Sequence, residues 1–223
     1  MPTLVRIQLL ADRQYFLAFS TYLSEISDIE LTEDTPDIIF DASFLDPAAK
    51  LKSLSAIATA PLIVSNSLTL SATKAQHAVG DRSRVVGMPI LPHYFERQKT
   101  IEFAMPLGAD DSEDVSTFLT LLGKTGEQTG DAIGGVFPRT LAMIINEAAF
   151  AVQESVALPA DIDLAMKLGT SYPKGPLAWC DEIGAEAIVA VLDALGREYG
   201  PERYRVASIL RRYSEAGMKF FPA

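Results

Sequence analysis

The sequence predicts a protein of two parts, an α/β domain with a parallel sheet followed by an all-α domain. In the first half, short apolar segments alternate with helical patterns, and this βαβ rhythm is typical of a parallel sheet. The second half holds the longest helical pattern of the chain, with no Pro or Gly between Thr140 and Leu158. We place the α/β domain at residues 1–130 and the helical domain at residues 131–223.

Strand and helix patterns follow one another through the first half. Strands are expected where apolar residues alternate or run continuously, and helices where they recur every three or four residues. The expected strands are 4–10, 37–42, 61–64, 84–88 and 99–105, and the expected helices are 14–26, 47–57 and 112–122. Gly123-Lys124-Thr125-Gly126 follows the last helix, and we expect the hinge between the domains there.

The first turn of the α/β domain lacks the feature that binds a dinucleotide. A dinucleotide-binding strand passes straight into a Gly-x-Gly-x-x-Gly turn, because bare backbone must approach the pyrophosphate at the N-terminus of the next helix. Here the turn reads Leu10-Ala11-Asp12-Arg13, and the first glycine of the chain is Gly80. Side chains, including the acidic Asp12, are therefore expected in the space that a diphosphate needs.

The helical domain begins with one long buried helix. Its main apolar stripe consists of Leu141, Ile144, Ile145, Ala148, Val152 and Val156. Further apolar residues, among them Phe150, lie off this stripe, so a single core contact cannot cover them all. Pro159 breaks the helix, and a second helix over 160–168 is closed by Gly169.

Composition and charge limit the classes of function. Hydrophobic residues make up 48% and charged residues 22% of the 223 residues, which is ordinary for a soluble globular protein. The formal charge of −10 disfavours nucleic acid and anionic membranes as partners. No apolar run approaches the roughly 18 residues of a membrane span. The single Cys180 cannot form an internal disulfide, which fits a reducing compartment, and we expect a cytoplasmic protein.

A series of motifs in the second half resembles a known family. The motifs are Arg139, Ile145-Asn146-Glu147-Ala148, Asp161-Ile162-Asp163, Met166-Lys167-Leu168-Gly169, Tyr172-Pro173-Lys174-Gly175-Pro176 and Asp181-Glu182-Ile183-Gly184. Their order and spacing resemble the C-terminal helical domain of the 3-hydroxyacyl-CoA dehydrogenases. The resemblance implies an NAD-dependent oxidoreductase of the fatty-acid or aromatic-acid degradation type, with a helical domain that forms a homodimer.

The first half resembles the later part of that family's Rossmann domain. Asp41, Lys50 and Asn66 match its Asp-containing strand, the Lys of the next helix and its Thr-Asn-Thr-Ser-Ser-Leu loop. Only residues 27–36 stand where the family has a further strand and helices, so the resemblance implies a shortened Rossmann-like domain.

The resemblance implies cofactor-binding roles for Lys50, Asn66 and Ser67. Asn66 and Ser67 end a strand, where α/β proteins place ligand groups, but both types are also common turn formers. Lys50 shares its helix with Lys52, and a lysine on an exposed helix face is usually only solvated. Both interpretations stay open for each residue.

The family's reaction is a hydride transfer between a nicotinamide and C3 of an acyl-CoA, with a His base paired to a Glu and with polar Asn and Ser side chains. Such roles need a titratable base and hydrogen-bonding groups at defined points. When the family's motif is aligned with this sequence, its Ser corresponds to Leu68, its His to Pro89 and its two Asn to Pro92 and Pro138. Glu102 alone is retained.

His93 and Glu102 are the candidate catalytic residues. His93-Tyr94-Phe95 is similar to the family's His-Phe-Phe, and a local shift would restore a base; the alternative is a loop His with no catalytic task. Glu102 lies in a strand pattern, where an outward-facing solvated carboxylate is the alternative.

We therefore interpret the chain as a 3-hydroxyacyl-CoA dehydrogenase-like pseudoenzyme, for which no cofactor is expected although the family implies NAD. The alternative is a non-catalytic dimeric protein that binds an acyl-CoA-like ligand or a related enzyme. A third interpretation is an enzyme with altered chemistry around Glu102 and His93.

Overall fold

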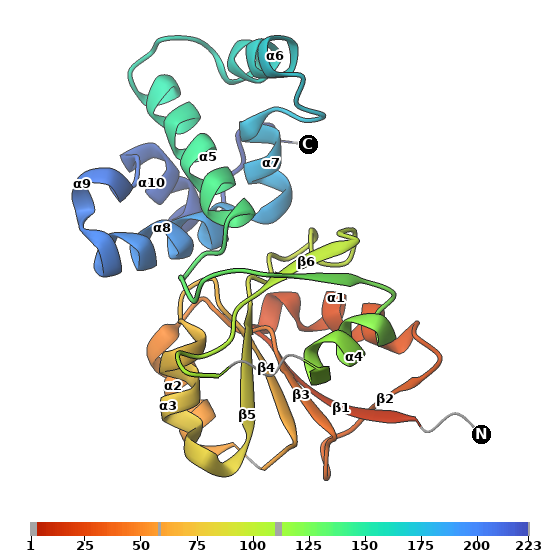
Figure 1. The fold of residues 1–223 in the computed structure, drawn as a ribbon. Helices are drawn as coiled ribbons and strands as arrows, with labels where there is room; N and C mark the ends of the chain where they lie inside the picture. Colours follow the sequence, from red (N-terminus) through yellow and green to blue (C-terminus); the bar gives the residue numbers. More distant parts are fainter. Residues whose placement is uncertain (1–3, 58, 110–112, 223) are drawn as a thin grey trace. The chain divides into compact units, whose positions relative to one another are not determined.

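A five-stranded parallel sheet organises the first half of the chain (Figure 1). The computed structural model describes residues 4–57, 59–109 and 113–222. The sheet has the order β2-β1-β3-β4-β5, and each neighbouring pair is parallel. Its strands are β1 (Val5–Leu10), β2 (Ile29–Leu31), β3 (Ile38–Asp41), β4 (Leu62–Asn66) and β5 (Arg84–Met88).

The β2 strand was not predicted, and no helix joins it to β3. β2 pairs with β1 over Val5–Ile7, whereas β3 pairs with β1 over Ile7–Leu10 on the other side. Residues 32–37 join the two strands without a helix, and Arg6 holds this link through hydrogen bonds to Asp37 and Thr35. Parallel strands are usually joined by a dozen residues or more, so this link is where the domain is shortened.

Two further strands form a small separate sheet. β6 (Thr100–Phe103) and β7 (Thr125–Gln128) pair in parallel, and a single antiparallel bridge joins Gly87 at the end of β5 to Ala104. The segment 123–126, where the sequence predicted a hinge, leads into β7 within the first compact unit.

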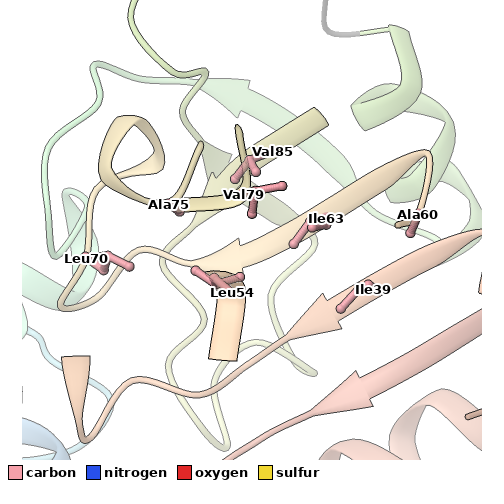
Figure 2. Packing of buried hydrophobic residues seen from close by; sticks show 8 residues of the cluster. All are labelled: Ile39, Leu54, Ala60, Ile63, Leu70, Ala75, Val79 and Val85. Carbon is pink, nitrogen blue, oxygen red and sulfur yellow. The ribbon is translucent and has the colours of Figure 1, made fainter. Parts of the chain in front are cut away.

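Helices cover both faces of the five-stranded sheet (Figure 1). They are α1 (Arg13–Ser24), α2 (Pro47–Ala56), α3 (Ala72–Val79) with the short η1 (Gly80–Arg82), and α4 (Glu113–Leu121). The predicted start of the last helix, residue 112, lies outside the described residues. Figure 2 shows the core beneath α2 and α3, where Leu54 and Val79 pack against Ile39, Ile63 and Val85 of the sheet.

The opposite face of the sheet is aromatic. Because side chains alternate along a strand, Phe40 points away from its neighbour Ile39, and its ring lies 6.0 Å from those of Phe19 of α1 and Phe118 of α4. All three rings are buried. These contacts fix α1, and therefore the first βα turn, over the carboxyl end of the sheet.

The compact units comprise residues 1–135 and 136–223, whereas the predicted domains divide after residue 130. The second unit is entirely helical within the described residues. Its helices are α5 (Phe137–Gln153), α6 (Pro159–Thr170), α7 (Pro176–Ile183), α8 (Ala185–Tyr199), α9 (Pro201–Tyr204) and α10 (Ser208–Ala216). Its core is formed by fully buried residues such as Ile145, Leu177, Ile188, Leu192 and Leu210.

Two helix ends differ from the prediction. α5 stops at Gln153, and Ser155 takes a left-handed conformation with φ of 59°, so Val156 lies beyond the helix and is 71% exposed. α6 continues through Gly169 and is closed by Ser171, which has φ of 57°. A left-handed residue commonly ends a helix, and neither serine carries a sequence signal for it.

Candidate functional site

The first βα turn is covered by the chain itself. The carboxylate of Asp12, just before α1, accepts hydrogen bonds from the backbone N–H of Phe44 at 2.9 Å and of Leu45 at 3.3 Å. The Phe44 ring is fully buried and stacks on Tyr15 in the first turn of α1, with 5.8 Å between centroids. The segment after β3 therefore lies against the start of α1.

Lys50 and Asp41 form a buried ion pair next to this segment. The Lys50 Nζ lies 2.8 Å from Oδ2 of Asp41 and donates a 2.8 Å hydrogen bond to the carbonyl of Ser43. The side chains are only 1% and 2% exposed, so the interpretation of Lys50 as a solvated lysine is wrong. Burial lowers the pKa of Lys50, and the charge of Asp41 opposes that shift.

Asn66 and Ser67 lie at the carboxyl end of β4, as predicted, but their contacts are internal. The amide nitrogen of the fully buried Asn66 donates to the carbonyls of Ala42 and Ile90, and its oxygen accepts from Leu68 and Ile90. The backbone of Ser67 bonds to Met88 and Gly134. Asn66 thus ties together the ends of β3, β4 and β5.

Glu102 and Pro89 both lie next to Gly135. A Cβ atom added to Gly135 would lie 2.8 Å from Oε2 of Glu102 and 2.6 Å from Cγ of Pro89. Glu102 and Pro89 thus meet at Gly135, which has φ of 59°. Pro89, the position to which the family resemblance assigns the His, therefore lies near Glu102.

His93 is held in a different environment. It takes a left-handed conformation with φ of 63°, and its ring contacts the edge of Tyr15 at 6.4 Å between centroids. It also lines a groove on the outer face of α1. A catalytic role for His93 and Glu102 therefore stays a prediction.

Lys124 was not singled out by sequence, yet it fixes the turn that carries His93. Its Nζ donates to the carbonyls of Phe95, Glu96 and Gln98 at 2.7, 3.1 and 2.6 Å. Burial lowers the pKa of Lys124, and the charge of Glu96 opposes this. A lysine after a Gly gives no local signal that its charge is buried among carbonyl groups.

In the second unit, three polar residues of the motifs bind backbone groups. Asp163 accepts from Leu177 and Ala178 at the start of α7, Asn146 bonds to Arg205 and Ala207, and Asp181 accepts from Phe220 and Phe221. Trp179 is buried. These three residues therefore hold the helices of the second unit together.

A parallel sheet with its first helix at the carboxyl edge, followed by a helical domain, defines the two-domain architecture of Rossmann-type dehydrogenases. Residues 134–219 match the family model described as 3-hydroxyacyl-CoA dehydrogenase, C-terminal domain. The structure is similar to the (S)-3-hydroxybutyryl-CoA dehydrogenase from Ralstonia eutropha, with a TM-score of 0.75 at 23% identity, over 96% of this chain and 95% of that one.

Two relatives are similar in sequence. The probable 3-hydroxybutyryl-CoA dehydrogenase of Bacillus subtilis is 33% identical over 187 residues, which are 81% of this chain and 65% of that protein. The 3-hydroxyadipyl-CoA dehydrogenase of Escherichia coli is 50% identical over 95 residues, 43% of this chain and 20% of that protein. The chain is thus similar to 3-hydroxyacyl-CoA dehydrogenases, with residues 134–219 matching the model of their C-terminal domain, and it spans less than two thirds of the length of either relative.

Other site types receive no support within the described ranges. Every helix there is too short or too polar to traverse a bilayer. No group of three or more His, Cys, Asp or Glu side chains there is arranged to hold a metal ion.

Proposed function

We propose that this chain is a 3-hydroxyacyl-CoA dehydrogenase-like protein that does not carry out NAD-dependent hydride transfer. The observation that supports this most directly is the contact between Asp12 and the backbone of Phe44 and Leu45. A dinucleotide pyrophosphate needs close approach to bare backbone at the first helix N-terminus. Here a carboxylate and a buried phenylalanine ring stand at that turn, so the residues do not fit the cofactor.

The polar groups nearby support the same conclusion. Lys50, which the family resemblance assigns to the cofactor, is fully buried and engaged by Asp41 and Ser43. Asn66 already makes four hydrogen bonds to its own chain. The cofactor roles of Lys50, Asn66 and Ser67 stay predictions, and the buried contacts of the first two favour a structural role.

The position to which the family resemblance assigns the catalytic His carries no base. General-base catalysis requires a titratable group within hydrogen-bond reach of the substrate proton. Pro89 meets Glu102 at Gly135, and a proline side chain neither accepts nor donates a proton. The residue that the resemblance matches to the catalytic His therefore cannot act as a base, and we expect no turnover by the family's mechanism.

The test combines binding and turnover, with an active family enzyme as the positive control. We expect no saturable NADH binding by calorimetry and no nicotinamide absorbance change with acetoacetyl-CoA and NADH or with 3-hydroxybutyryl-CoA and NAD. Saturable micromolar NADH binding would contradict the proposal. So would wild-type turnover that His93→Ala and Glu102→Gln both abolish, because it would show a site rebuilt around His93.

A second candidate function is that of a non-catalytic dimeric binding protein, and α6 favours it. Its outer side exposes Leu164 at 51% and Leu168 at 75%, while its inner side buries Asp163. The charges on this surface are self-complementary. Asp161 lies three residues before Leu164, and Lys167 lies three residues after it. If two copies of α6 pair antiparallel with their Leu164 side chains in contact, Asp161 of each copy lies opposite Lys167 of the other. We propose a homodimer formed through α6.

The ligand proposed for this dimer is an acyl-CoA-like molecule. The support is the similarity of the chain to the Escherichia coli 3-hydroxyadipyl-CoA dehydrogenase. Calorimetric titration with acetoacetyl-CoA, with free coenzyme A as a second ligand, tests this without any cofactor. If neither ligand binds, the acyl-CoA-like ligand is excluded, and binding of a related enzyme is the next hypothesis to test.

A further inference from the structure

The strand β7 forms an open edge of the small sheet in the first unit. Thr125 donates its backbone N–H to the carbonyl of Lys99 at 2.8 Å, so its backbone groups face β6. Along a paired strand the backbone groups of successive residues point to alternate sides, so those of Gly126 and Gln128 point away from β6. Both residues are exposed, and β6 is the strand that borders β7 among the described residues. The outer side of β7 therefore presents backbone donors and acceptors to solvent.

The rest of the unit holds this strand in its extended form. A Cβ atom at Gly126 would lie 2.6 Å from Cδ1 of Leu119 in α4 and 2.8 Å from Cε1 of Phe103 in β6, and both of these side chains are buried. The hydroxyl groups of Thr100 and Thr125 lie 3.1 Å apart across the two strands. Because the edge is ordered beforehand, pairing with a further strand costs it little conformational entropy.

The residues of β7 do not block the addition of a strand. Native proteins commonly protect an exposed edge with Pro, with Lys or with a β-bulge. The strand Thr125–Gln128 contains neither Pro nor Lys, and it pairs with β6 residue by residue without a bulge. Such an edge is a template for β-augmentation, in which an extended peptide adds one strand to a sheet.

The charge on one face of the small sheet selects the kind of strand that fits. Glu102 and Glu127 are register partners in β6 and β7, so their side chains leave the same face of the sheet next to each other. Like charges in neighbouring positions are destabilising, whereas opposite charges stabilise a cross-strand pair. Glu127 is exposed, and a basic side chain on a third strand would relieve the repulsion between the two carboxylates.

The backbone pattern places that basic side chain opposite Glu127. In an antiparallel strand added to β7, the residues opposite Gly126 and Gln128 form the hydrogen-bonded pairs. The residue opposite Glu127 forms the non-hydrogen-bonded pair, in which the side chains lie closest together. A second copy of β7 in this register would set Glu127 against Glu127, so the charge disfavours pairing between two copies of this chain.

We propose that β7 binds an extended segment of a partner protein, which adds as an antiparallel strand and carries a lysine or arginine opposite Glu127. The formal charge of −10 on the chain also favours a basic segment. This surface belongs to the first unit, so the proposal does not depend on the dimer proposed through α6.

The probe is an acetylated and amidated Thr-Val-Lys-Val-Thr peptide, titrated to millimolar concentration into the full chain and followed by NMR of the backbone amides. We expect saturable shifts in β7 and slower hydrogen exchange of the Gly126 and Gln128 amides, because these two donate to the added strand. The same peptide with both valines N-methylated keeps its charge but loses the N–H groups that face β7, and it should not bind. A peptide with Glu in place of Lys should bind at least about threefold more weakly.

Glu127→Lys should reverse the preference, so that the Glu peptide binds more tightly than the Lys peptide. Glu30→Lys is the matched control, because it makes the same charge change at an exposed position of β2, the edge strand of the larger sheet, and it should leave the preference unchanged. Failure of the Lys peptide to bind, equal binding of the N-methylated peptide, or an unchanged preference in Glu127→Lys would overturn the proposal. It would also be overturned if the Gly126 and Gln128 amides are protected in the free protein and lose protection on dilution, since a second copy would then occupy the edge.

Discussion

The ammonium of Lys50 lies 2.8 Å from the carboxylate of Asp41, and both side chains are almost completely buried at the carboxyl end of the sheet. The pair joins α2 to β3 and holds the segment that covers the first βα turn. Removing one partner of a buried ion pair leaves an uncompensated charge, at a cost of about 3–5 kcal/mol. We expect Lys50→Met to lower the free energy of unfolding by this amount in urea titrations.

Lys52→Met is the matched control, since Lys52 lies on the same helix and is exposed. Its effect should stay within about 0.5 kcal/mol. A loss below about 1 kcal/mol for Lys50→Met would mean that the pair contributes little and that the segment after β3 is held by other contacts.

Asp12 gives the second prediction. Asp12→Ala removes the acceptor for Phe44 and Leu45, and a hydrogen bond to a charged group contributes about 1.5–3 kcal/mol. Hydrogen exchange at these two amides should become faster by more than tenfold, while exchange in β4 changes only with global stability. Unchanged protection of both amides would show that Asp12 does not hold the segment.

The sequence predicts the helices and strands of the first unit better than it predicts the contacts of Lys50 and Asp12. Helix and strand existence in the first unit follows from local periodicity, but β2 was missed because three residues carry no usable pattern. Lys50 and Lys52 look alike in sequence, and only the fold places Asp41, nine residues earlier, against one of them. The contact of Asp12 with Phe44 joins residues 32 positions apart, which no local pattern encodes.

Asp163 and Gly175 give a third prediction. The carboxylate of Asp163 accepts from Leu177 and Ala178 at 2.8 and 2.9 Å, and a Cβ atom at Gly175 would overlap it. We expect Gly175→Ala to destabilise the protein by more than 2 kcal/mol, of the order of other overpacked sites. Gly169→Ala is the control, because nothing lies within 4 Å of its Cβ position, and it should be neutral or stabilise by up to about 1 kcal/mol.

The overlap also predicts a coupling. Asp163→Gly alone removes the acceptor of two backbone N–H groups and places a glycine inside α6, so it should cost about 3 kcal/mol. In the double variant with Gly175→Ala, the Asp163 carboxylate and the Asp163 Cβ atom that would overlap the new Cβ are both absent, so the loss should be smaller than the two single losses added together. Strict additivity in denaturant titrations would contradict a direct contact between these residues.

Cys180 makes stability depend on pH in the alkaline range. Burial raises the pKa of its thiol, and the charges of Asp181 and Glu186 raise it further. The folded thiol keeps its proton where the unfolded thiol, with a pKa of about 8.5, loses it. The stabilising contribution is therefore complete below about pH 8.5 and falls above it by up to about 1.4 kcal/mol per pH unit.

The measurement is the difference in unfolding free energy between the wild type and Cys180→Ala from pH 7 to pH 10. We expect the wild type to lose stability relative to the variant as pH rises above 8.5. A difference that does not depend on pH would show that the folded thiol titrates normally, and rapid alkylation of the native protein by iodoacetamide would show that it is accessible.

The last prediction concerns the dimer proposed through α6. Sequence favoured the long helix as the source of unpaired apolar surface, but Ala142 and Ala149 of α5 are buried within the unit, and Phe150 lies under the guanidinium of Arg205. Exposed apolar side chains lie instead on α6, at Leu164 and Leu168, and just before it, at Val156 and Leu158. Leu164→Asp places two like charges at the centre of the proposed pairing, and sedimentation at micromolar concentration should show the 24.2 kDa monomer in place of the dimer.

Charge reversal tests the geometry of this pairing separately from its hydrophobicity. Asp161→Lys alone sets it against Lys167 of the second copy and should weaken the dimer, whereas Asp161→Lys combined with Lys167→Asp restores opposite charges across the antiparallel pair. Because exposed pairs contribute only about 0.2–1 kcal/mol each, the expected change in dissociation constant is about two- to thirtyfold for the two symmetric contacts together. A wild type that sediments only as a monomer would refute the dimer, and a dimer that responds to Leu164→Asp but not to charge reversal would show that α6 pairs in another orientation.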